Sequence, residues 1–299
     1  RFRPDIVMTR TRFFSNALLG AKFAKFRILP LPLIHVEHGS SHVELSSALT
    51  TKLAYFYDKT FGKLIFFLAD KPVAISRAVH DFVTKEFVSK REVPIIRRGI
   101  DFRLYAQTKP DRAFRNRYQD KTIIAYLGRL YKWKNVGSAI RAFHELPKEL
   151  SEQAVFVVIG DGEDKQDLEE IAKEGHGEVR FTGPVGFDAA IAMLKEVDIY
   201  VHSATPGGGL SNSLLQAMMC ECGIVATPHE GAGEVITEEN GLLVPDASVA
   251  SLRKGMEQLL GNAQLQKRYG KKARETVEQS FDWEQVVKEY ERVFDEVLS

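Results

Sequence analysis

Residues 206–218 read PGGGLSNSLLQAM, in which three consecutive glycines lead into a helical pattern. A strand-like run, Ile199–His202, precedes them, so the chain passes from a strand through a glycine turn into a helix. Glycines let backbone N–H groups approach a ligand closely, and the N-terminus of the following helix adds partial positive charge. The stretch is either a phosphate cradle or a plain change of chain direction in which Ser211 or Asn212 caps the helix.

The same order of strand, turn and helix repeats through the C-terminal two thirds of the chain. Short turns between such segments predict a parallel sheet covered by helices, an α/β fold whose ligands bind at the carboxyl ends of the strands. Strands are expected at residues 122–127, 154–159, 179–181, 199–202, 224–227 and 242–244, and helices at 136–146, 164–173, 187–195, 212–219 and 249–260.

The chain is long enough for two domains. A length of 299 residues exceeds one ordinary hydrophobic core. The polar region 104–121, which contains Lys109-Pro110, is the expected boundary. We therefore expect domains at 1–105 and 106–282, followed by an amphipathic helix within 283–299. Strand candidates of the first domain are 5–8, 33–37, 72–75 and 93–96.

Two cations follow the expected strand 122–127. Gly128 ends this strand, Arg129 comes next, and Lys134 stands five residues later on a short turn into a helix. On such a turn both side chains can converge on one anion, Arg129 as a planar fork and Lys134 as a point charge. A diphosphate is the natural ligand, although the spacing alone also suits two solvated cations beside a turn.

Several short motifs, taken together, carry a resemblance. They are GRL at 128–130 with KN at 134–135, VIGDG at 158–162, FTG at 181–183, LSNSLLQAM at 210–218 and NGLLV at 240–244, preceded by RPDIV at 3–7, EHG at 37–39 and GID at 99–101. In this order and spacing they resemble family 4 retaining glycosyltransferases with the B-type fold. The resemblance covers essentially the whole chain. It implies two Rossmann-like domains facing each other across a cleft, the first on the acceptor side and the second holding the nucleotide sugar, with the C-terminal helix packed back on the first.

The resemblance also assigns roles and implies a metal-independent, hexosyltransferase-type enzyme. Arg129 and Lys134 would neutralise the donor diphosphate in place of a metal ion, so neither metal nor cofactor is expected beyond the nucleotide-diphosphate sugar as co-substrate. His38 would lie near the donor sugar and the acceptor, although a strand-end histidine can also be purely structural. The donor-binding residues implied are Gly128, Gly183, Val185, Gly208, Gly209, Leu210, Ser211, Asn212, Ser213, Leu214 and Gln216.

The chain departs from the family pattern at three positions. Gly208 and Gln216 stand where the family usually carries glutamates, and Arg98 stands where an asparagine commonly precedes the Gly-Ile-Asp turn. Glutamine can still hydrogen-bond a ribose hydroxyl, but glycine offers a donor sugar no side chain. The alternative of a degenerate, non-catalytic nucleotide-sugar-binding protein therefore stays open. A nucleotide-sugar epimerase or a glycan phosphorylase is the other alternative, but their acid–base groups and cofactor lysine cannot be placed.

The family's first strand, glycine-rich loop and helix have no counterpart before Arg3. We therefore expect an incomplete N-terminal domain, completed by another polypeptide or within a homo-oligomer, or a chain that is part of a longer protein. The acceptor would be a glycan or a lipid-linked sugar.

Charge and cysteine content bear on location. The formal net charge is +1, and no extended basic stripe favours nucleic acid. The stretch from Arg10 to Arg27 is basic and aromatic, which suits either an anionic membrane surface or an exposed basic helix with its aromatic face in the core. Cys220 and Cys222 are too close for an unstrained disulfide, which favours a reducing compartment. We expect a cytoplasmic protein, at the inner face of the membrane if it contacts one.

Overall fold

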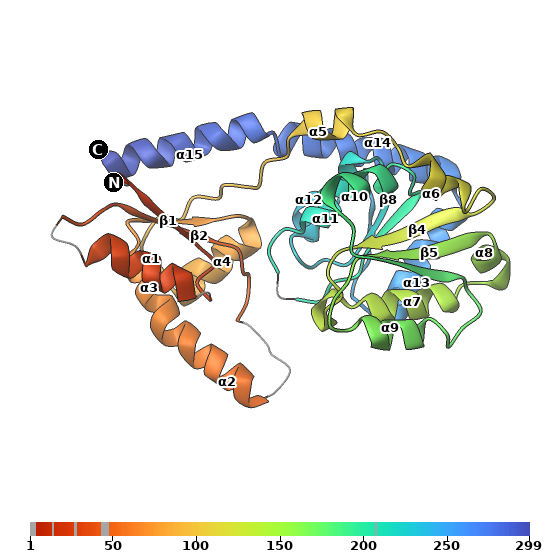
Figure 1. Ribbon diagram of the computed structural model, residues 1–299, viewed down its shortest axis with the longest axis horizontal. Helices are drawn as coiled ribbons and strands as arrows, with labels where there is room; N and C mark the ends of the chain where they lie inside the picture. The colour runs from red at the N-terminus through yellow and green to blue at the C-terminus, as the bar shows by residue number, and fades with distance from the viewer. Residues whose placement is uncertain (1–3, 14, 27–28, 43–47, 207) are drawn as a thin grey trace. The chain divides into compact units, whose positions relative to one another are not determined.

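The computed structural model describes residues 4–13, 15–26, 29–42, 48–206 and 208–299, and the chain divides into two compact units (Figure 1). Unit 1 comprises Arg1–Ile100, Gly207–Leu210 and Phe281–Ser299. Unit 2 comprises Asp101–Pro206 and Ser211–Ser280. Each unit has its own parallel sheet. The α/β fold class expected from the alternating pattern is confirmed.

Among the described residues of unit 2, six parallel strands form one sheet in the order β6-β5-β4-β7-β8-β9. Counted within the unit this order is 3-2-1-4-5-6, the order of the dinucleotide-binding fold, which reverses direction beside β4. The central strands are buried on both faces, which explains their continuous apolar sequences. The strands are β4 (Thr122–Leu127), β5 (Ala154–Ile159), β6 (Val179–Gly183), β7 (Ile199–His202), β8 (Gly223–Ala226) and β9 (Leu242–Leu243).

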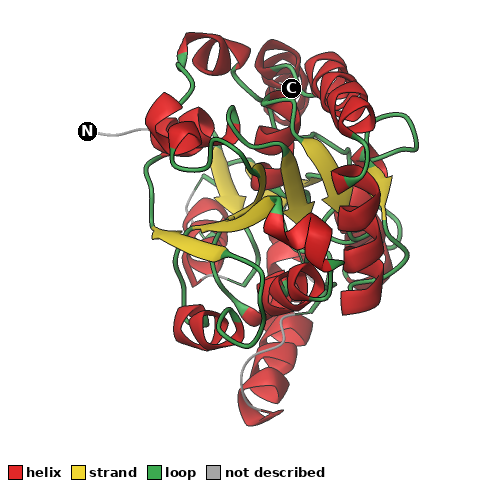
Figure 2. Cartoon of the chain, turned by 90° about the vertical axis from the view of Figure 1, so that its right-hand side faces the viewer, coloured by secondary structure: helices red, strands yellow, loops and turns green. Residues whose placement is uncertain are grey.

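Helices cover both faces of this sheet (Figures 1 and 2). The helix α7 packs on α9 and α13, and their apolar side chains share one core with β4 and β5. The helices are α5 (Phe102–Gln107), α6 (Arg112–Asn116), the 3₁₀ turn η2 (Lys132–Lys134), α7 (Val136–His144), α8 (Lys148–Glu152), α9 (Lys165–Ile171), α10 (Phe187–Leu194), α11 (Asn212–Met219), α12 (Ala232–Val235), α13 (Val249–Leu260) and α14 (Ala263–Ser280).

Glycine is required where β4 and β5 end. Gly128 and Gly160 adopt φ values of +152° and +139°, which side-chain-bearing residues rarely adopt. A Cβ on Gly160 would lie 1.9 Å from the carbonyl oxygen of Gly128. The two strand ends therefore touch through their backbones, and this contact fixes the start of the loop that carries Arg129 and Lys134.

In the described part of unit 1, three parallel strands run in the order β1-β2-β3. The C-terminal helix α15 shares their core, because its Val286 and Val293 are buried in the cluster that contains Ile34 and Val36 of β2. The elements are β1 (Val7–Arg10), α1 (Ser15–Lys25), β2 (Leu33–Glu37), α2 (Ala48–Tyr57), the π-helical turn η1 (Asp58–Gly62), α3 (Lys63–Leu68), β3 (Lys71–Ala74), α4 (Arg77–Glu86) and α15 (Trp283–Leu298).

The strand expected at 93–96 is wrong. This segment forms only an isolated parallel bridge between Ala74 and Ile95. The hydrogen bonds run from Ala74 N to Pro94 O and from Ile96 N to Ala74 O, and Pro94 has no N–H with which to extend the ladder.

None of the helices in the described ranges combines the length and the apolar composition that crossing a bilayer requires.

Candidate functional site

Lys134 in unit 2 is held by a carboxylate. Its Nζ donates to Oε1 and Oε2 of Glu230 at 2.8 and 2.6 Å. The lysine side chain is 20% exposed and that of Glu230 only 4%. Glu230 follows β8 and adopts φ +49°, an uncommon conformation for a residue with a side chain. The ammonium group has three N–H donors and uses two of them in its hydrogen bonds to Glu230, so one remains for a ligand.

The turn that carries Lys134 is held in place by hydrogen bonds from the residues that follow β7. Ser203 Oγ donates to Lys134 O at 2.7 Å, and Thr205 N donates to Trp133 O at 2.8 Å. Asn135 follows in the left-handed region at φ +53°, and its Nδ2 donates to Ala247 O at 2.9 Å. These bonds tie η2 to the carboxyl edge of the sheet, where parallel α/β folds bind ligands.

Arg129 lies at the same edge and carries no ion pair within the described residues. Its backbone carbonyl accepts a 2.9 Å hydrogen bond from Tyr126 OH, and its guanidinium lies 5.0 Å from the centre of the Tyr131 ring. Tyr131 stacks on Trp133 with ring centres 4.7 Å apart. The guanidinium is thus supported by aromatic rings, while its charge is left for an anion.

The start of α11 presents backbone groups rather than side chains to this edge. Ser211 occupies the N-cap position without a side-chain capping bond, and its N–H donates to Glu230 O at 3.0 Å. Ser213 Oγ accepts from Tyr200 OH at 2.9 Å, and the Leu214 side chain is buried in the core. Asn212 is exposed and Gln216 half-buried. Glu230 therefore links the start of α11 to Lys134.

The turn after β6 holds the expected base-flanking residues. Gly183 adopts φ +75°, and no atom lies within 4 Å of where its Cβ would stand. Its carbonyl accepts from Gly160 N at 3.1 Å, which ties the turn to the end of β5. Val185 follows, half-buried.

His38 belongs to unit 1, together with the expected donor-binding residues Gly208, Gly209 and Leu210. Ser40 Oγ donates to Gly208 O at 2.7 Å. A Cβ on Gly209 would lie only 2.5 Å from the His38 carbonyl oxygen. Gly208 and Gly209 therefore pack directly on the loop after β2, at His38, whereas Ser211 is linked through Glu230 to Lys134.

The His38 loop is oriented by Glu37. Oε1 of this carboxylate accepts from His38 N at 2.8 Å and from Gly39 N at 2.7 Å. Burial alone would raise the pKa of Glu37, but the hydrogen bond from His35 and the charge of Arg12 lower this pKa to about 2. Burial, with a further contribution from the charge of Arg98, lowers the pKa of His38 to about 4. Glu37 is thus charged and His38 neutral at physiological pH.

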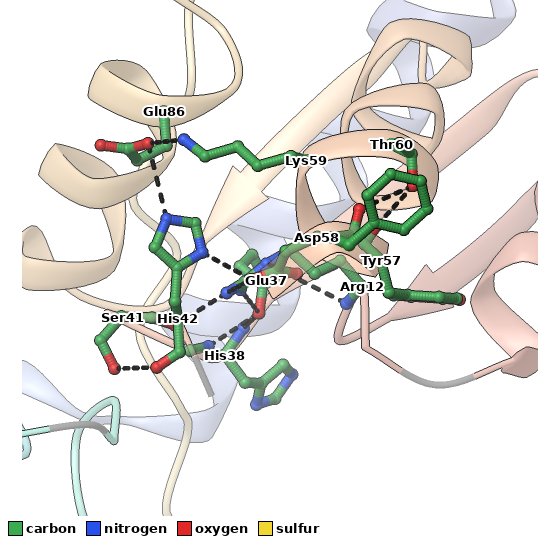
Figure 3. A network of polar contacts seen from close by, with 12 residues as sticks. Arg12, Glu37, His38, Ser41, His42, Tyr57, Asp58, Lys59, Thr60 and Glu86 are labelled. Atoms are coloured by element: carbon green, nitrogen blue, oxygen red, sulfur yellow. Dashed lines mark hydrogen bonds and ion pairs between the residues drawn. The ribbon is translucent and has the colours of Figure 1, made fainter. Parts of the chain in front are cut away.

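Arg12 anchors Glu37 within a buried charge network (Figure 3). The guanidinium donates to Asp58 from Nε at 2.8 Å and from Nη2 at 3.0 Å, and its Nη1 lies 3.1 Å from Glu37 Oε1. His42 adds a 2.7 Å contact to Asp58, and the side chain of His38 points away from this network in Figure 3. No sequence pattern indicates this network, because its members are separated by up to 46 residues along the chain.

The structure corrects one expectation for the stretch from Arg10 to Arg27. Arg12 is 1% exposed and cannot contact a membrane, and Lys25 pairs with Asp70 at 2.5 Å. Arg27 lies outside the described residues. The alternative of an aromatic face in the core is wrong for Phe23 and Phe26. The helix α1 buries Ala17, Ala21 and Ala24 and leaves Leu19 and Phe23 exposed, and Phe26, which follows the helix, is exposed as well.

Two residues of the site were missed by the sequence analysis: Glu230, which pairs with Lys134, and Glu37 in its role of orienting His38. The available signal was position alone. Each residue stands at or just after the carboxyl end of a strand, where ligands of α/β proteins bind.

This arrangement, a parallel sheet of dinucleotide-binding order with two cations at its carboxyl edge, defines an α/β ligand-binding domain, and the comparisons with known proteins give its family. Residues 107–276 match the family described as glycosyl transferases group 1, to which this chain belongs. An uncharacterized glycosyltransferase of Methanocaldococcus jannaschii is 46% identical over 99% of this chain and 76% of its own length. The chain is accordingly a glycosyltransferase of hexosyltransferase type.

Two further comparisons extend this result. The N-acetylgalactosamine-N,N'-diacetylbacillosaminyl-diphospho-undecaprenol 4-alpha-N-acetylgalactosaminyltransferase of Campylobacter jejuni is 30% identical over 68% of this chain, which spans 54% of that relative. The solved structure of Anabaena HepE in complex with UDP-glucose has a TM-score of 0.77 at 20% identity, and the match covers 98% of this chain and 79% of HepE. At that identity the likeness confirms the B-type fold.

Proposed function

We propose that this chain transfers a hexosyl group from a nucleoside-diphosphate sugar to a glycan or lipid-linked acceptor, with retention of anomeric configuration and without a metal ion. The observation that carries the proposal is the placement of Arg129 and Lys134 at the carboxyl edge of the unit 2 sheet, beside the start of α11. Each offers donors to phosphate oxygens: the guanidinium of Arg129 has no ion pair within the described residues, and Lys134 keeps one N–H beside its ion pair with Glu230.

The proposed chemistry follows from these groups. Negative charge develops on the diphosphate as the bond from the sugar breaks, and Arg129 and Lys134 stabilise it. Backbone N–H groups at the start of α11 add partial positive charge. The departing phosphate oxygen takes the proton of the attacking hydroxyl on the same face of the sugar, so the configuration is retained. Gln216 is assigned to the ribose and the turn at Gly183 to Val185 to the base.

The relatives support particular donor and acceptor classes. HepE has been solved with UDP-glucose, which makes uridine nucleotides the first donors to test. The name of the Campylobacter jejuni relative includes a diphospho-undecaprenol acceptor, which favours a lipid-linked acceptor here. The exposed Leu19 and Phe23 of α1 and the exposed Phe26 that follows it, beside Lys22, provide a surface suited to a membrane carrying such a lipid. The free thiols of Cys220 and Cys222 favour the cytoplasmic side.

The donor site is tested by binding of UDP and UDP-glucose, with GDP and ADP as comparisons. In the double variant Lys134→Met/Glu230→Gln both charges are removed, so no buried carboxylate is left unpaired. We expect it to bind the diphosphate more weakly by roughly 1.5–3 kcal/mol, the range for hydrogen bonds to charged groups. Lys132→Met, on the exposed face of the same turn, is the matched control and should bind as the wild type does.

Four outcomes decide the proposal. Unchanged diphosphate affinity in the double variant would contradict the placement of the site. Transfer that EDTA abolishes and magnesium restores would contradict the metal-free mechanism, and the anomeric configuration of the first product, read by NMR, tests retention. Nucleotide binding without transfer to any acceptor would favour the non-catalytic alternative that Gly208 and Gln216 leave open.

A further inference from the structure

Arg98 and His38 in unit 1 make a contact that fixes where the imidazole proton sits. Nη2 of Arg98 lies 2.9 Å from Nδ1 of His38. A guanidinium group can only donate, so Nδ1 must accept. A neutral imidazole carries one proton, which is then on Nε2. The usual arrangement in enzymes is the reverse, with Nδ1–H donating to a carboxylate or carbonyl and Nε2 free to act as a base.

The charges around His38 keep this state in place. A protonated imidazole would carry a proton on Nδ1, lose the bond to Arg98 and face its charge. Besides burial, the pKa of His38 is lowered by the charges of Arg98, Arg10 and His35 and raised only by Glu37. The Glu37 carboxylate already accepts from two backbone N–H groups and pairs with Arg12, so it is not free to bind the imidazole.

Arg98 has no acidic partner among the described residues. Its pKa is lowered by burial and by the charge of Arg10. Two buried donors in this cluster, Nε of Arg98 and Nε2 of His38, have no hydrogen-bond partner within the described part of the chain. An unpaired buried donor is costly, and such groups in native proteins usually mark a function or a missing ligand. Both atoms require an oxygen that accepts.

We propose that Arg98 is a positioning residue that fixes His38 as an Nε2–H donor, so that His38 binds a substrate oxygen by donating to it and takes no proton from the acceptor. The oxygen is a sugar hydroxyl or a phosphate oxygen of the substrate. The identity of the substrate rests on the proposed function, whereas the tautomer does not. The acceptor's proton then leaves with the phosphate, as in the proposed mechanism.

The tautomer is tested in the free protein, without any substrate. Long-range ¹H–¹⁵N NMR on ¹⁵N-histidine-labelled protein, with His38 assigned through His38→Gln, distinguishes a protonated from an unprotonated ring nitrogen. We expect Nε2 protonated, Nδ1 unprotonated and no titration of His38 above pH 5. In Arg98→Met we expect the Nδ1–H form to appear and the titration to move up toward neutral pH, whereas Arg98→Lys should restore the wild-type tautomer.

Arg97→Met is the matched control, because it removes the neighbouring arginine, whose guanidinium lies 6.0 Å from the Phe281 ring. It should leave the His38 signals unchanged. An Nδ1–H tautomer in the wild type, or identical His38 spectra in the wild type and Arg98→Met, would overturn the proposal. Neither result depends on transfer being observed, so failure here is separate from failure of the proposed function.

Transfer kinetics then test whether His38 acts as a hydrogen-bond donor. Glutamine at position 38 can donate a hydrogen bond but cannot act as a base, so we expect His38→Gln to retain transfer within about tenfold, whereas His38→Leu loses more. Loss of a general base costs roughly 100- to 10,000-fold. A loss of that size in His38→Gln, together with disappearance of an acidic limb in the pH profile of kcat, would show that His38 accepts the proton and would contradict the proposal.

Discussion

Arg12 carries a buried charge on which the loop of His38 depends. It pairs with Asp58 and Glu37, both of whose side chains are fully buried, and lies over the rings of Phe82 and Phe87 at 4.8 and 5.1 Å. Removing one member of such a network leaves uncompensated charge in the interior. Arg12→Met should therefore lower the free energy of unfolding by roughly 3–5 kcal/mol.

Urea unfolding followed by tryptophan fluorescence measures this effect. The chain has two tryptophans, Trp133 in unit 2 and Trp283 in unit 1, where Trp283 packs on Gly99. In a Trp133→Phe background the fluorescence therefore comes from Trp283 and reports on unit 1. Arg292→Met, on the exposed side of α15 in the same unit, is the control and should cost no more than about 0.5 kcal/mol. Equal unfolding free energies in the two arginine variants would mean that the Arg12 network contributes little.

At the level of single residues, sequence reasoning succeeded where a role depends on neighbours along the chain. The lysine five residues after Arg129 was expected at the sheet edge because a strand end and a short turn place it there. Its partner Glu230 lies 96 residues away and could not be inferred. Arg12 looked like a surface cation because its partners are also distant along the chain: Glu37 and Asp58, which pair with it, belong to other elements.

At the level of elements, the sequence pattern predicted where a helix or strand begins and ends wherever the spacing of apolar residues and the turn residues indicated the same boundary. The helix α11 begins at Asn212 and ends at Met219, as the glycine turn and apolar spacing predicted, and β4 spans Thr122–Leu127 as expected. The failure at 93–96 has a local cause that was also readable, because Pro94 cannot donate to a ladder. The alternative that placed the aromatic side chains in the core failed at Phe23, because the small alanines of α1 face the core instead.

The glycine segment before α11 carries the element-scale prediction. A Cβ on Gly209 would lie 2.5 Å from His38 O and 3.0 Å from Ile75 Cδ1, so Gly209→Ala must displace the segment from the His38 loop. Misplacement of about 1 Å can cost roughly 100-fold in rate. We expect kcat/KM to fall by up to about this factor while stability changes little, as measured by initial rates and urea unfolding.

Gly186→Ala is the matched control, because no atom lies within 4 Å of the added Cβ and the backbone there has φ −68°. It should retain nearly full activity. Wild-type kcat/KM in Gly209→Ala would show that close packing of the segment on His38 is not needed for transfer.

At the level of the whole molecule, the α/β fold could be predicted because the same order of strand, turn and helix repeats along the chain. The family resemblance then indicated the B-type fold. What the sequence could not supply is how the residues at the strand ends are paired across the sheet. Those pairs leave neutral histidines buried in both units. Burial, with a further contribution from Lys134, lowers the pKa of His202 in unit 2 to about 3, and the pKa of His38 in unit 1 is lowered to about 4.

Each unit should therefore become less stable in mild acid. A histidine whose folded pKa lies below its unfolded value of 6.5 binds a proton more readily in the unfolded chain, so stability is complete above pH 6.5 and falls as the pH drops toward the folded pKa. Between pH 6.5 and 4.5 each histidine should cost its unit roughly 2–3 kcal/mol. Glu37, with a pKa lowered to about 2, adds its own loss only below about pH 4.5.

Urea unfolding at four pH values measures the free energy of unfolding of each unit. The Trp133→Phe background reports on unit 1 and the Trp283→Phe background on unit 2. We expect His38→Gln to reduce the pH dependence of unit 1 and His202→Gln to reduce that of unit 2. His80→Gln on α4 should flatten neither, and a stability that is constant from pH 7 to 4.5 in both units would contradict the assignment of neutral buried histidines.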